Sequence, residues 1–207
     1  MATNIWPTIH AERAALIDDV SGLTAEEWAL PTMCADWNVH QVLAHLTSAA
    51  KMTPPTFFGK FAGAGFNFNK FTAKEVAAES AGGPAATLAE FRAVQRRQTS
   101  PPGPKETWLG EAFVHGEDIR RPLGISRDYP LDQVSTALGF YARSNTVIGG
   151  KNRIAGLTMR ATDVDYSIGD GDVVEGPVMS LLLAASGRKA ALDDLSGPGV
   201  DTLRARG

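Results

Sequence analysis

The sequence has only one cysteine, Cys34, among its 207 residues. A single cysteine cannot form an internal disulfide and cannot supply a thiolate-rich structural zinc site, which agrees with a reducing compartment. No cation stands near Cys34 in the sequence to stabilise a thiolate. We therefore interpret it as a small buried hydrophobe rather than as a nucleophile.

Long apolar runs are also missing. The most apolar segment, residues 177–185, is interrupted by Ser180 and is far shorter than the roughly 20 residues that cross a bilayer. The N-terminus lacks the basic patch and apolar block of a secretion signal. These absences predict a cytoplasmic protein with no membrane partner.

The chain has no long run of charges of one sign. The net charge is −3, and no long run of like charges gives a reason to expect nucleic acid as a partner. Hydrophobic residues make up 43% and charged residues 21%, which is typical of a soluble globular protein long enough to bury a full core.

Apolar residues recur at helical spacing in most of the chain, which predicts a mainly α protein built as a helical bundle. The second helix has Asp36 or Asn38 as its cap, contains His45 and ends before Pro54. The other helices are expected at residues 7–23, 85–98, 108–123 and 131–148.

The pattern changes after residue 150. Residues 157–161 and 164–168 alternate apolar with polar side chains, as strands do, and a turn follows at 169–172. Helices at 177–185 and 188–195 and a short strand near 200–203 would complete a small C-terminal α/β appendage. We therefore divide the chain into a helical bundle at 1–150 and an α/β region at 151–207.

A phenylalanine-rich segment covers residues 56–74. Gly59, Gly63 and Gly65 weaken any long regular helix there. The segment is interpreted either as an irregular helical lid over a pocket or as rings that fill the core.

A metal site is suggested by Glu111 and His115, which stand four residues apart and so share one face of a helix. His45, on a second helix, is the third candidate ligand. Two imidazoles and one carboxylate suit zinc with a fourth position left for water or substrate, although iron, nickel or manganese could use the same ligands.

Each of these residues also has an ordinary interpretation. A histidine on a helix face is often hydrogen-bonded in the core, and an acid four residues before a histidine can be a simple side-chain pair. Asp118 could orient the imidazole of His115, or it could form a salt bridge with Arg121. His10 and His40 are weaker candidates, because their positions point elsewhere.

Several segments together resemble the mycothiol-dependent maleylpyruvate isomerase family, which belongs to the DinB-like metalloenzymes. The resemblance extends over nearly the whole chain and is strongest around the two candidate histidines. The segments that carry it are Glu12-Arg13, Trp28, Cys34-Ala-Asp-Trp37-Asn-Val, His45-Leu, Glu111-Ala-Phe-Val-His115-Gly-Glu-Asp118-Ile-Arg-Arg-Pro-Leu-Gly124, Gly176-Pro177 and Ser186-Gly-Arg188.

This resemblance implies a DinB-like four-helix bundle that binds a divalent metal, usually zinc, through His45, Glu111 and His115. It implies mycothiol, the small thiol of actinobacteria, as cosubstrate. It also implies that residues 151–207 form a reduced sterol-carrier-like domain, shorter than that of the isomerase itself, in which Arg188 has a catalytic role. Asp118 is our other candidate catalytic residue, because it could orient the imidazole of His115.

The leading hypothesis is that the metal lowers the pKa of the thiol and presents a thiolate to a small electrophile. Reversible addition to a conjugated double bond would be isomerisation, and irreversible addition would be S-transfer. A carboxylate of the substrate could bind Arg92, Arg96 or Arg188. The alternatives are a thiol-independent metal hydrolase and a non-catalytic ligand-binding module, and the sequence is compatible with an oligomer.

Overall fold

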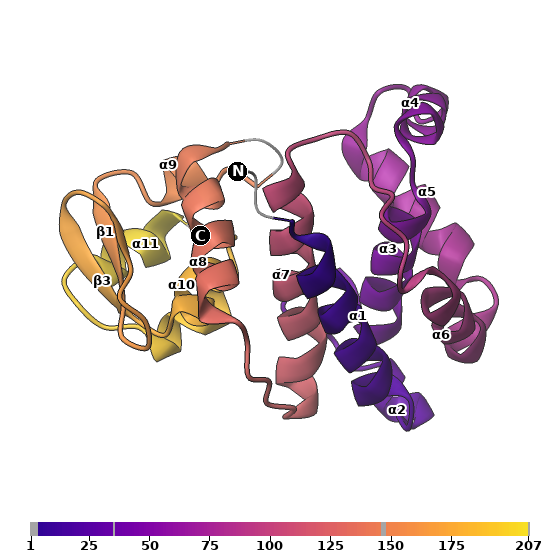
Figure 1. Cartoon of the computed structure of the whole chain (residues 1–207), viewed down its shortest axis with the longest axis horizontal. Helices are drawn as coiled ribbons and strands as arrows, with labels where there is room; N and C mark the ends of the chain where they lie inside the picture. Colours follow the sequence, from indigo (N-terminus) through magenta and orange to yellow (C-terminus); the bar gives the residue numbers. More distant parts are fainter. Residues whose placement is uncertain (1–3, 35, 146–147, 207) are drawn as a thin grey trace. The chain divides into compact units, whose positions relative to one another are not determined.

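The computed structural model describes residues 4–34, 36–145 and 148–206. The chain divides into two compact units, Met1–Ser126 and Arg127–Gly207. The described part of the first unit is helical (Figure 1), with the helices α1 (Trp6–Val20), α2 (Ala25–Trp28), α3 (Val39–Lys51), α4 (Pro54–Gly63), α5 (Phe68–Ser80), α6 (Gly83–Val94) and α7 (Lys105–Leu123).

The core of the first unit lies between α1, α3, α6 and α7. Buried apolar side chains from all four helices form one cluster, which includes Leu16, Val42, Phe91 and Ile119. Burial of such side chains contributes roughly 1.5–3 kcal/mol each to stability. The predicted four-helix bundle is confirmed, because each of these helices turns one apolar stripe toward the others.

Buried charges connect α1 to α7 within this core. The Arg120 side chain is fully buried, and its Nε donates to Oδ2 of Asp19 at 2.7 Å. Its Nη1 lies 3.5 Å from Oε2 of Glu12, which is also buried. Removing one partner of such a group leaves an uncompensated charge, so the pairs fix how α1 and α7 align.

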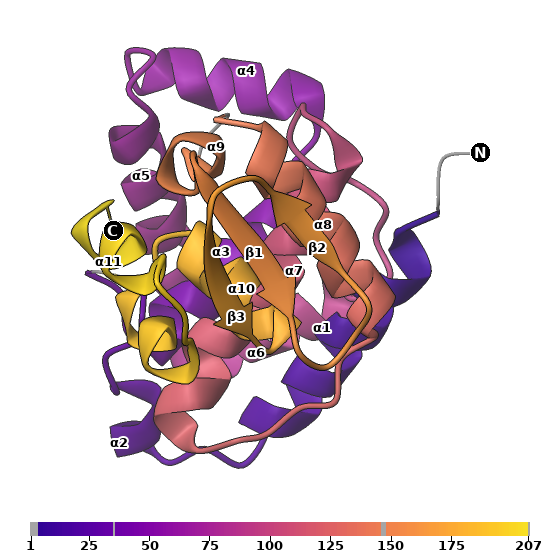
Figure 2. The ribbon, with the colours of Figure 1, turned by 90° about the vertical axis from the view of Figure 1, so that its left-hand side faces the viewer.

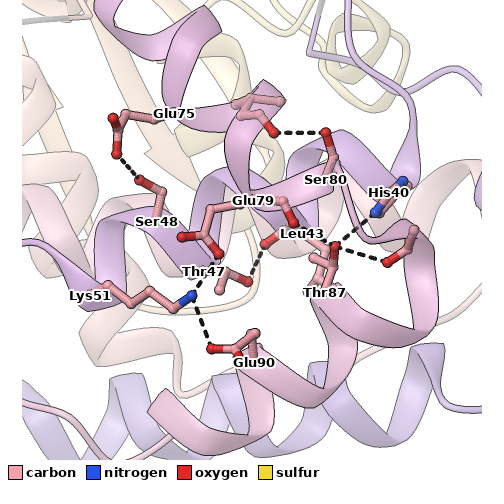
Figure 3. Close-up of polar contacts among 12 residues, drawn as sticks. His40, Leu43, Thr47, Ser48, Lys51, Glu75, Glu79, Ser80, Thr87 and Glu90 are labelled. Atoms are coloured by element: carbon pink, nitrogen blue, oxygen red, sulfur yellow. Dashed lines mark hydrogen bonds and ion pairs between the residues drawn. The ribbon is translucent and has the colours of Figure 1, made fainter.

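A polar network holds α5 and α6 on α3 (Figure 3). Lys51 Nζ lies 2.7 Å from Oε2 of Glu79 on α5 and 3.0 Å from Oε2 of Glu90 on α6. One turn earlier in α3, Ser48 Oγ donates to Oε2 of Glu75 at 3.1 Å. These contacts join three helices along the face of α3 that meets α5 and α6.

The phenylalanine-rich segment forms two helices, α4 and α5, rather than one irregular lid. Helix α4 continues through Gly59 because Thr53 caps its start, accepting from Thr56 N, and prolines occupy its first turn. Three rings form a small local cluster with Met52 and Ala64, and three others are exposed: Phe57, Phe61 and Phe71 in the first group, and Phe58, Phe66 and Phe68 in the second.

The second unit packs helices on a small sheet (Figure 2). The sheet has the order β2-β1-β3, with β1 antiparallel to β2 and parallel to β3. All eight residues of α10 are buried. The elements are α8 (Leu131–Arg143), α9 (Gly150–Arg153), β1 (Leu157–Ala161), β2 (Ser167–Gly169), β3 (Asp172–Gly176), α10 (Val178–Ala185), a 3-10 helix (Lys189–Asp194) and α11 (Val200–Arg206).

Three details of this unit differ from the sequence prediction. Helix α8 ends at Arg143 and packs against α10 in the second unit, so the units divide before α8 and not at residue 150. Residues 146 and 147, which the predicted helix included, lie outside the described residues. The predicted strand near 200–203 is wrong: the segment is helix α11. Ser196 already pairs with Glu175 of β3, so the chain turns into a helix that buries Leu203.

Among the described residues, no helix combines the length and the apolar character that a membrane span requires.

Candidate metal centre

Helix α3 places His45 at the edge of the bundle core. Asn38 caps the helix by accepting from the backbone of Gln41 at 2.9 Å, while the Gln41 side chain accepts from the backbone of Asn38 at 3.0 Å. Asn38, and not Asp36, is therefore the cap. Because Val42 and Leu46 are buried three residues before and one residue after His45, the imidazole lies beside the core and not in solvent.

Helix α7 supplies the other two candidate ligands. Its buried stripe includes Leu109, Phe113 and Ile119, and the helix packs against α1 and α3. Glu111 and His115 are four residues apart on the flank of this stripe, so both side chains project together.

The structure brings the three predicted ligands together. Nε2 of His45 lies 3.2 Å from Oε1 of Glu111, and the rings of His45 and His115 meet edge to face with centroids 4.8 Å apart. One ligand atom of each residue lies within 4.8 Å of the others. The three side chains are mostly buried, with exposures of 18%, 17% and 13% for His45, Glu111 and His115.

These donors fit a divalent cation. In a tetrahedral zinc site with bonds of about 2.0–2.1 Å, two ligand atoms are about 3.3 Å apart. The 3.2 Å between His45 and Glu111 matches that edge. Two nitrogens and one carboxylate oxygen also form a donor set that leaves a coordination position open.

Asp118 determines which nitrogen of His115 faces the site. Oδ2 of Asp118 lies 2.8 Å from Nδ1 of His115, and the Asp118 side chain is fully buried. An ionised carboxylate can only accept, so Nδ1 of His115 donates to Asp118 and Nε2 is the nitrogen left to face the site. A histidine that binds a metal usually donates its other N–H to a carboxylate in this way.

The surroundings keep Glu111 ionised. Burial by itself would raise the pKa of its carboxyl group. The hydrogen bond and charge of His45, the charge of His115 and that of Arg13 outweigh burial, so the pKa of Glu111 lies below its usual value. A carboxylate that is already deprotonated can bind a cation without losing a proton first.

Arg13 was not predicted as part of the site. It lines a small pocket together with Glu111, Glu12 and Trp108. Burial lowers the pKa of the Arg13 guanidinium and Glu111 raises it, and Nη1 donates to the backbone oxygen of Arg97 at 3.0 Å. The sequence could have indicated that Arg13 lies beside Glu111 only if it showed which face of α1 meets α7. Helical periodicity alone does not show this.

Trp37 and Cys34 also lie nearer to the site than expected. The Trp37 ring lies 4.9 Å from that of His45 and 6.4 Å from that of His115, measured between centroids. Ligand-type atoms of Cys34, His115 and Asp118 lie within 4.8 Å of one another. Cys34 packs at the edge of the bundle core but is only half buried, so it is more exposed than the small buried hydrophobe that the sequence predicted.

The weaker histidine candidates lie elsewhere in the first unit. His10 Nε2 is 3.4 Å from the backbone oxygen of Arg97, and His40 Nε2 is 2.8 Å from Oγ1 of Thr87 (Figure 3). Neither is part of a cluster of metal-ligand atoms among the described residues.

The arginines proposed to bind substrate have separate positions. Arg92 donates to Oγ of Ser21 at 2.7 Å, and Arg96 is exposed. Arg188, in the second unit, donates to the backbone oxygen of Ser186 at 3.1 Å. The catalytic roles of Arg188 and Asp118 remain predictions.

Comparisons with known proteins match this architecture. The family described as "Mycothiol maleylpyruvate isomerase N-terminal domain" matches residues 9–120, which include all three candidate ligands. Two similar solved structures are those of the mycothiol-dependent maleylpyruvate isomerase and of a histidine-to-alanine mutant of it. For each, identity is 15%, coverage is 93% of this chain and 91% of the other, and the TM-score is 0.62.

At 15% identity, the likeness to these structures establishes the fold alone. No curated protein matches the chain. The family match covers more than half of the sequence and includes the helices that carry the site. The chain therefore belongs to the mycothiol maleylpyruvate isomerase N-terminal domain family.

Proposed function

We propose that His45, Glu111 and His115 bind one divalent cation, with zinc the metal best suited to two imidazoles and a carboxylate. The observation that carries this proposal is the approach of His45 Nε2 to Glu111 Oε1 at 3.2 Å, with a ligand atom of His115 within 4.8 Å of both. Iron, nickel and manganese accept the same donors, so metal analysis must identify the ion.

With this site, we propose a thiol-dependent isomerase or S-transferase that acts on a small electrophile. A divalent cation with an open coordination position lowers the pKa of a thiol bound there, and the thiolate is the nucleophilic form. The thiol we propose is mycothiol, which the similar solved enzyme uses according to its name. We propose that the reaction takes place in the cytoplasm of an actinobacterium, because mycothiol is the small thiol of these bacteria.

The chain's own residues prepare the site for that chemistry. Asp118 holds the proton on Nδ1 of His115 and so keeps Nε2 free to bind a cation. Arg13 favours the ionised form of Glu111. Trp37 covers both imidazoles with an apolar ring, which lowers the local dielectric and strengthens the electrostatic interactions there.

Substrate binding is proposed to use an arginine, because guanidinium binds carboxylates through two parallel hydrogen bonds. Arg188 is our first choice and Arg92 and Arg96 are the alternatives. We also propose that the second unit is a reduced sterol-carrier-like domain.

The test is turnover of maleylpyruvate by the full chain, with and without mycothiol, before and after treatment with a chelator. We expect activity only when both thiol and metal are present, and recovery when zinc is restored. His45→Ala should abolish activity. His10→Gln is the matched control and should retain activity, since His10 lies outside the site.

Turnover that survives complete removal of metal would contradict the proposal. Metal-dependent hydrolysis of an ester without any added thiol would instead support a thiol-independent hydrolase.

A further inference from the structure

A short stretch of the first unit combines aromatic rings with positive charge. Residues 53–74, named here the aromatic hairpin, contain six phenylalanines, three lysines and no aspartate or glutamate. The chain as a whole has a net charge of −3, so this stretch differs in sign from the rest. It comprises α4 and the first half of α5, and α4 lies at the outer edge of its unit (Figure 1).

The hairpin exposes much of its apolar surface. None of the residues of α4 is fully buried. Phe58 is 60% exposed, Phe66 71% and Phe68 45%, and these are the large hydrophobic residues most exposed in the described part of the chain. Exposed aromatic residues gathered in one place, with charges around them, are typical of an interaction surface.

Backbone strain occurs at the same place. Phe66 has a φ of 56°, in the left-handed region that side chains other than glycine and asparagine rarely adopt. It follows Gly65, whose φ is 68°. The turn between α4 and α5 thus holds a large ring in an unfavourable conformation and exposes it. Strained conformations persist only where the surrounding structure enforces them, and they are enriched at functional surfaces.

The hairpin is also anchored to the bundle. Phe71 and Val76 of α5 are buried, and Glu75 pairs with Lys60. Glu79 also pairs with Lys51, and Glu75 accepts from Ser48 (Figure 3). The exposed rings therefore extend from a fixed support. They are not part of a frayed end.

Positive charge remains after these contacts are counted. Glu75 offsets Lys60. Lys74 reaches only a backbone oxygen, that of Gly63, and Lys70 has no carboxylate within ion-pair distance among the described residues. The rings are thus accompanied by two lysines whose charge is not neutralised.

We infer that the aromatic hairpin binds the surface of an anionic lipid bilayer. Rings of this type enter the boundary between headgroups and acyl chains, while lysines are attracted to anionic headgroups. A second copy of this chain is a poorer occupant, because a symmetric contact would bring the lysines of the two hairpins together. This binding is peripheral and needs no membrane-spanning helix, and it replaces the expectation from the sequence that the protein has no membrane partner. It is independent of the proposed reaction at the metal centre.

The test is cosedimentation of the full chain with vesicles. We expect binding to vesicles of phosphatidylglycerol mixed with phosphatidylcholine, and none to phosphatidylcholine alone. Binding should be largely lost at about 1 M salt, where the screening length falls to about 3 Å.

Two pairs of substitutions separate the contributions of rings and charge. The double variant Phe58→Gln and Phe66→Asn should bind at least about tenfold more weakly, because two apolar side chains no longer leave water. Asparagine tolerates a left-handed backbone, so the substitution at position 66 should not lower the melting temperature of this variant below that of the wild type. Lys70→Gln with Lys74→Gln should also weaken binding. The matched control, Lys105→Gln with Lys151→Gln, should bind as the wild type does.

The inference is overturned if the wild type does not sediment with anionic vesicles at low salt. It is also overturned if the double phenylalanine variant binds as tightly as the wild type. Self-association in the ultracentrifuge that this variant abolishes, without any vesicle binding, would identify a second copy as the occupant instead.

Discussion

Helix α3 carries two histidines whose surroundings differ sharply. His40 faces α6, where its Nε2 lies 2.8 Å from Oγ1 of Thr87 (Figure 3). That hydroxyl already donates to the backbone oxygen of Glu79, so His40 donates and both groups are satisfied. His45, five residues later, meets the carboxylate of Glu111 and the ring of His115.

The difference shows how a structural polar contact is distinguished from a site. On the α5 and α6 side, each donor meets an acceptor, and the charges of Lys51 are balanced by two glutamates. On the α7 side, nitrogen and oxygen atoms of three side chains that can each bind a metal lie within 4.8 Å of one another. Nitrogen and oxygen atoms that all carry lone pairs repel one another at this separation unless a bound cation or protons lie between them.

The largest expected effect is on the affinity for metal. Glu111→Gln removes the anionic ligand and should weaken zinc binding by more than about a hundredfold, beyond the effect of losing an outer partner. Glu79→Gln, which changes a glutamate on the opposite side of α3, should leave zinc affinity unchanged. A competition titration with a chelator measures both, and equal affinities for the two variants would contradict the comparison.

Asp118, the partner of His115, and Thr87, the partner of His40, should also respond differently to substitution. Asp118→Asn should lower zinc affinity by about ten- to a hundredfold, because His115 loses the anion that orients its ring. Thr87→Val should leave zinc affinity unchanged and should lower the free energy of unfolding by about 1–3 kcal/mol, since His40 loses its acceptor. The same titration and urea denaturation give the two quantities. Loss of zinc affinity in Thr87→Val would show that the two sides are not independent.

Lys51→Met tests the charged part of the α5 and α6 side. The Lys51 side chain is 30% exposed and Glu90 is 58% exposed, so solvent screens that pair strongly, whereas Glu79 is only 17% exposed and its pair is screened less. We expect a loss of about 0.5–1 kcal/mol in the free energy of unfolding and no change in bound metal. A loss well above that range would contradict the view that these ion pairs contribute little to the free energy of unfolding.

The smallest effect concerns pH. Burial lowers the pKa of His40 below its ordinary value of 6.5. At pH values between the pKa of His40 in the folded protein and its pKa in the unfolded chain, the unfolded chain binds more protons. The free energy of unfolding therefore falls as the pH drops through about 6.5. His40→Gln should reduce this fall. Melting temperatures from about pH 8 to about pH 5 would measure it, and the account of His40 would be wrong if the two proteins had parallel profiles.

The bundle could be predicted because its helices are amphipathic along most of their length. The spacing of Glu111 and His115 predicts two candidate ligands on one face of a helix, and the buried stripe around Val42 and Leu46 predicts that the candidate His45 lies beside the core. The helical periodicity of α3 and of α7 does not show whether the two helices meet where these residues lie. Whether they meet there depends on how side chains of α1, α6 and α7 interlock around α3.

Other features could not be predicted from local patterns. The place of Arg13 beside Glu111 depends on the rotation of α1 against α7, which the buried Arg120 contacts fix. The segment 200–203 has strand-like residues but lies where β3 already has a partner in Ser196. The division of the chain before α8 follows from its packing on α10, and helical periodicity does not show which neighbour a helix chooses.

The most direct test of the metal centre is an anomalous difference map from crystals grown with zinc, measured at the zinc absorption edge. The account predicts one peak in the first unit, about 2.0–2.2 Å from Nε2 of His45, a carboxylate oxygen of Glu111 and Nε2 of His115. The absence of a peak there, or a zinc ion bound at full occupancy elsewhere while the two imidazoles turn apart, would contradict it.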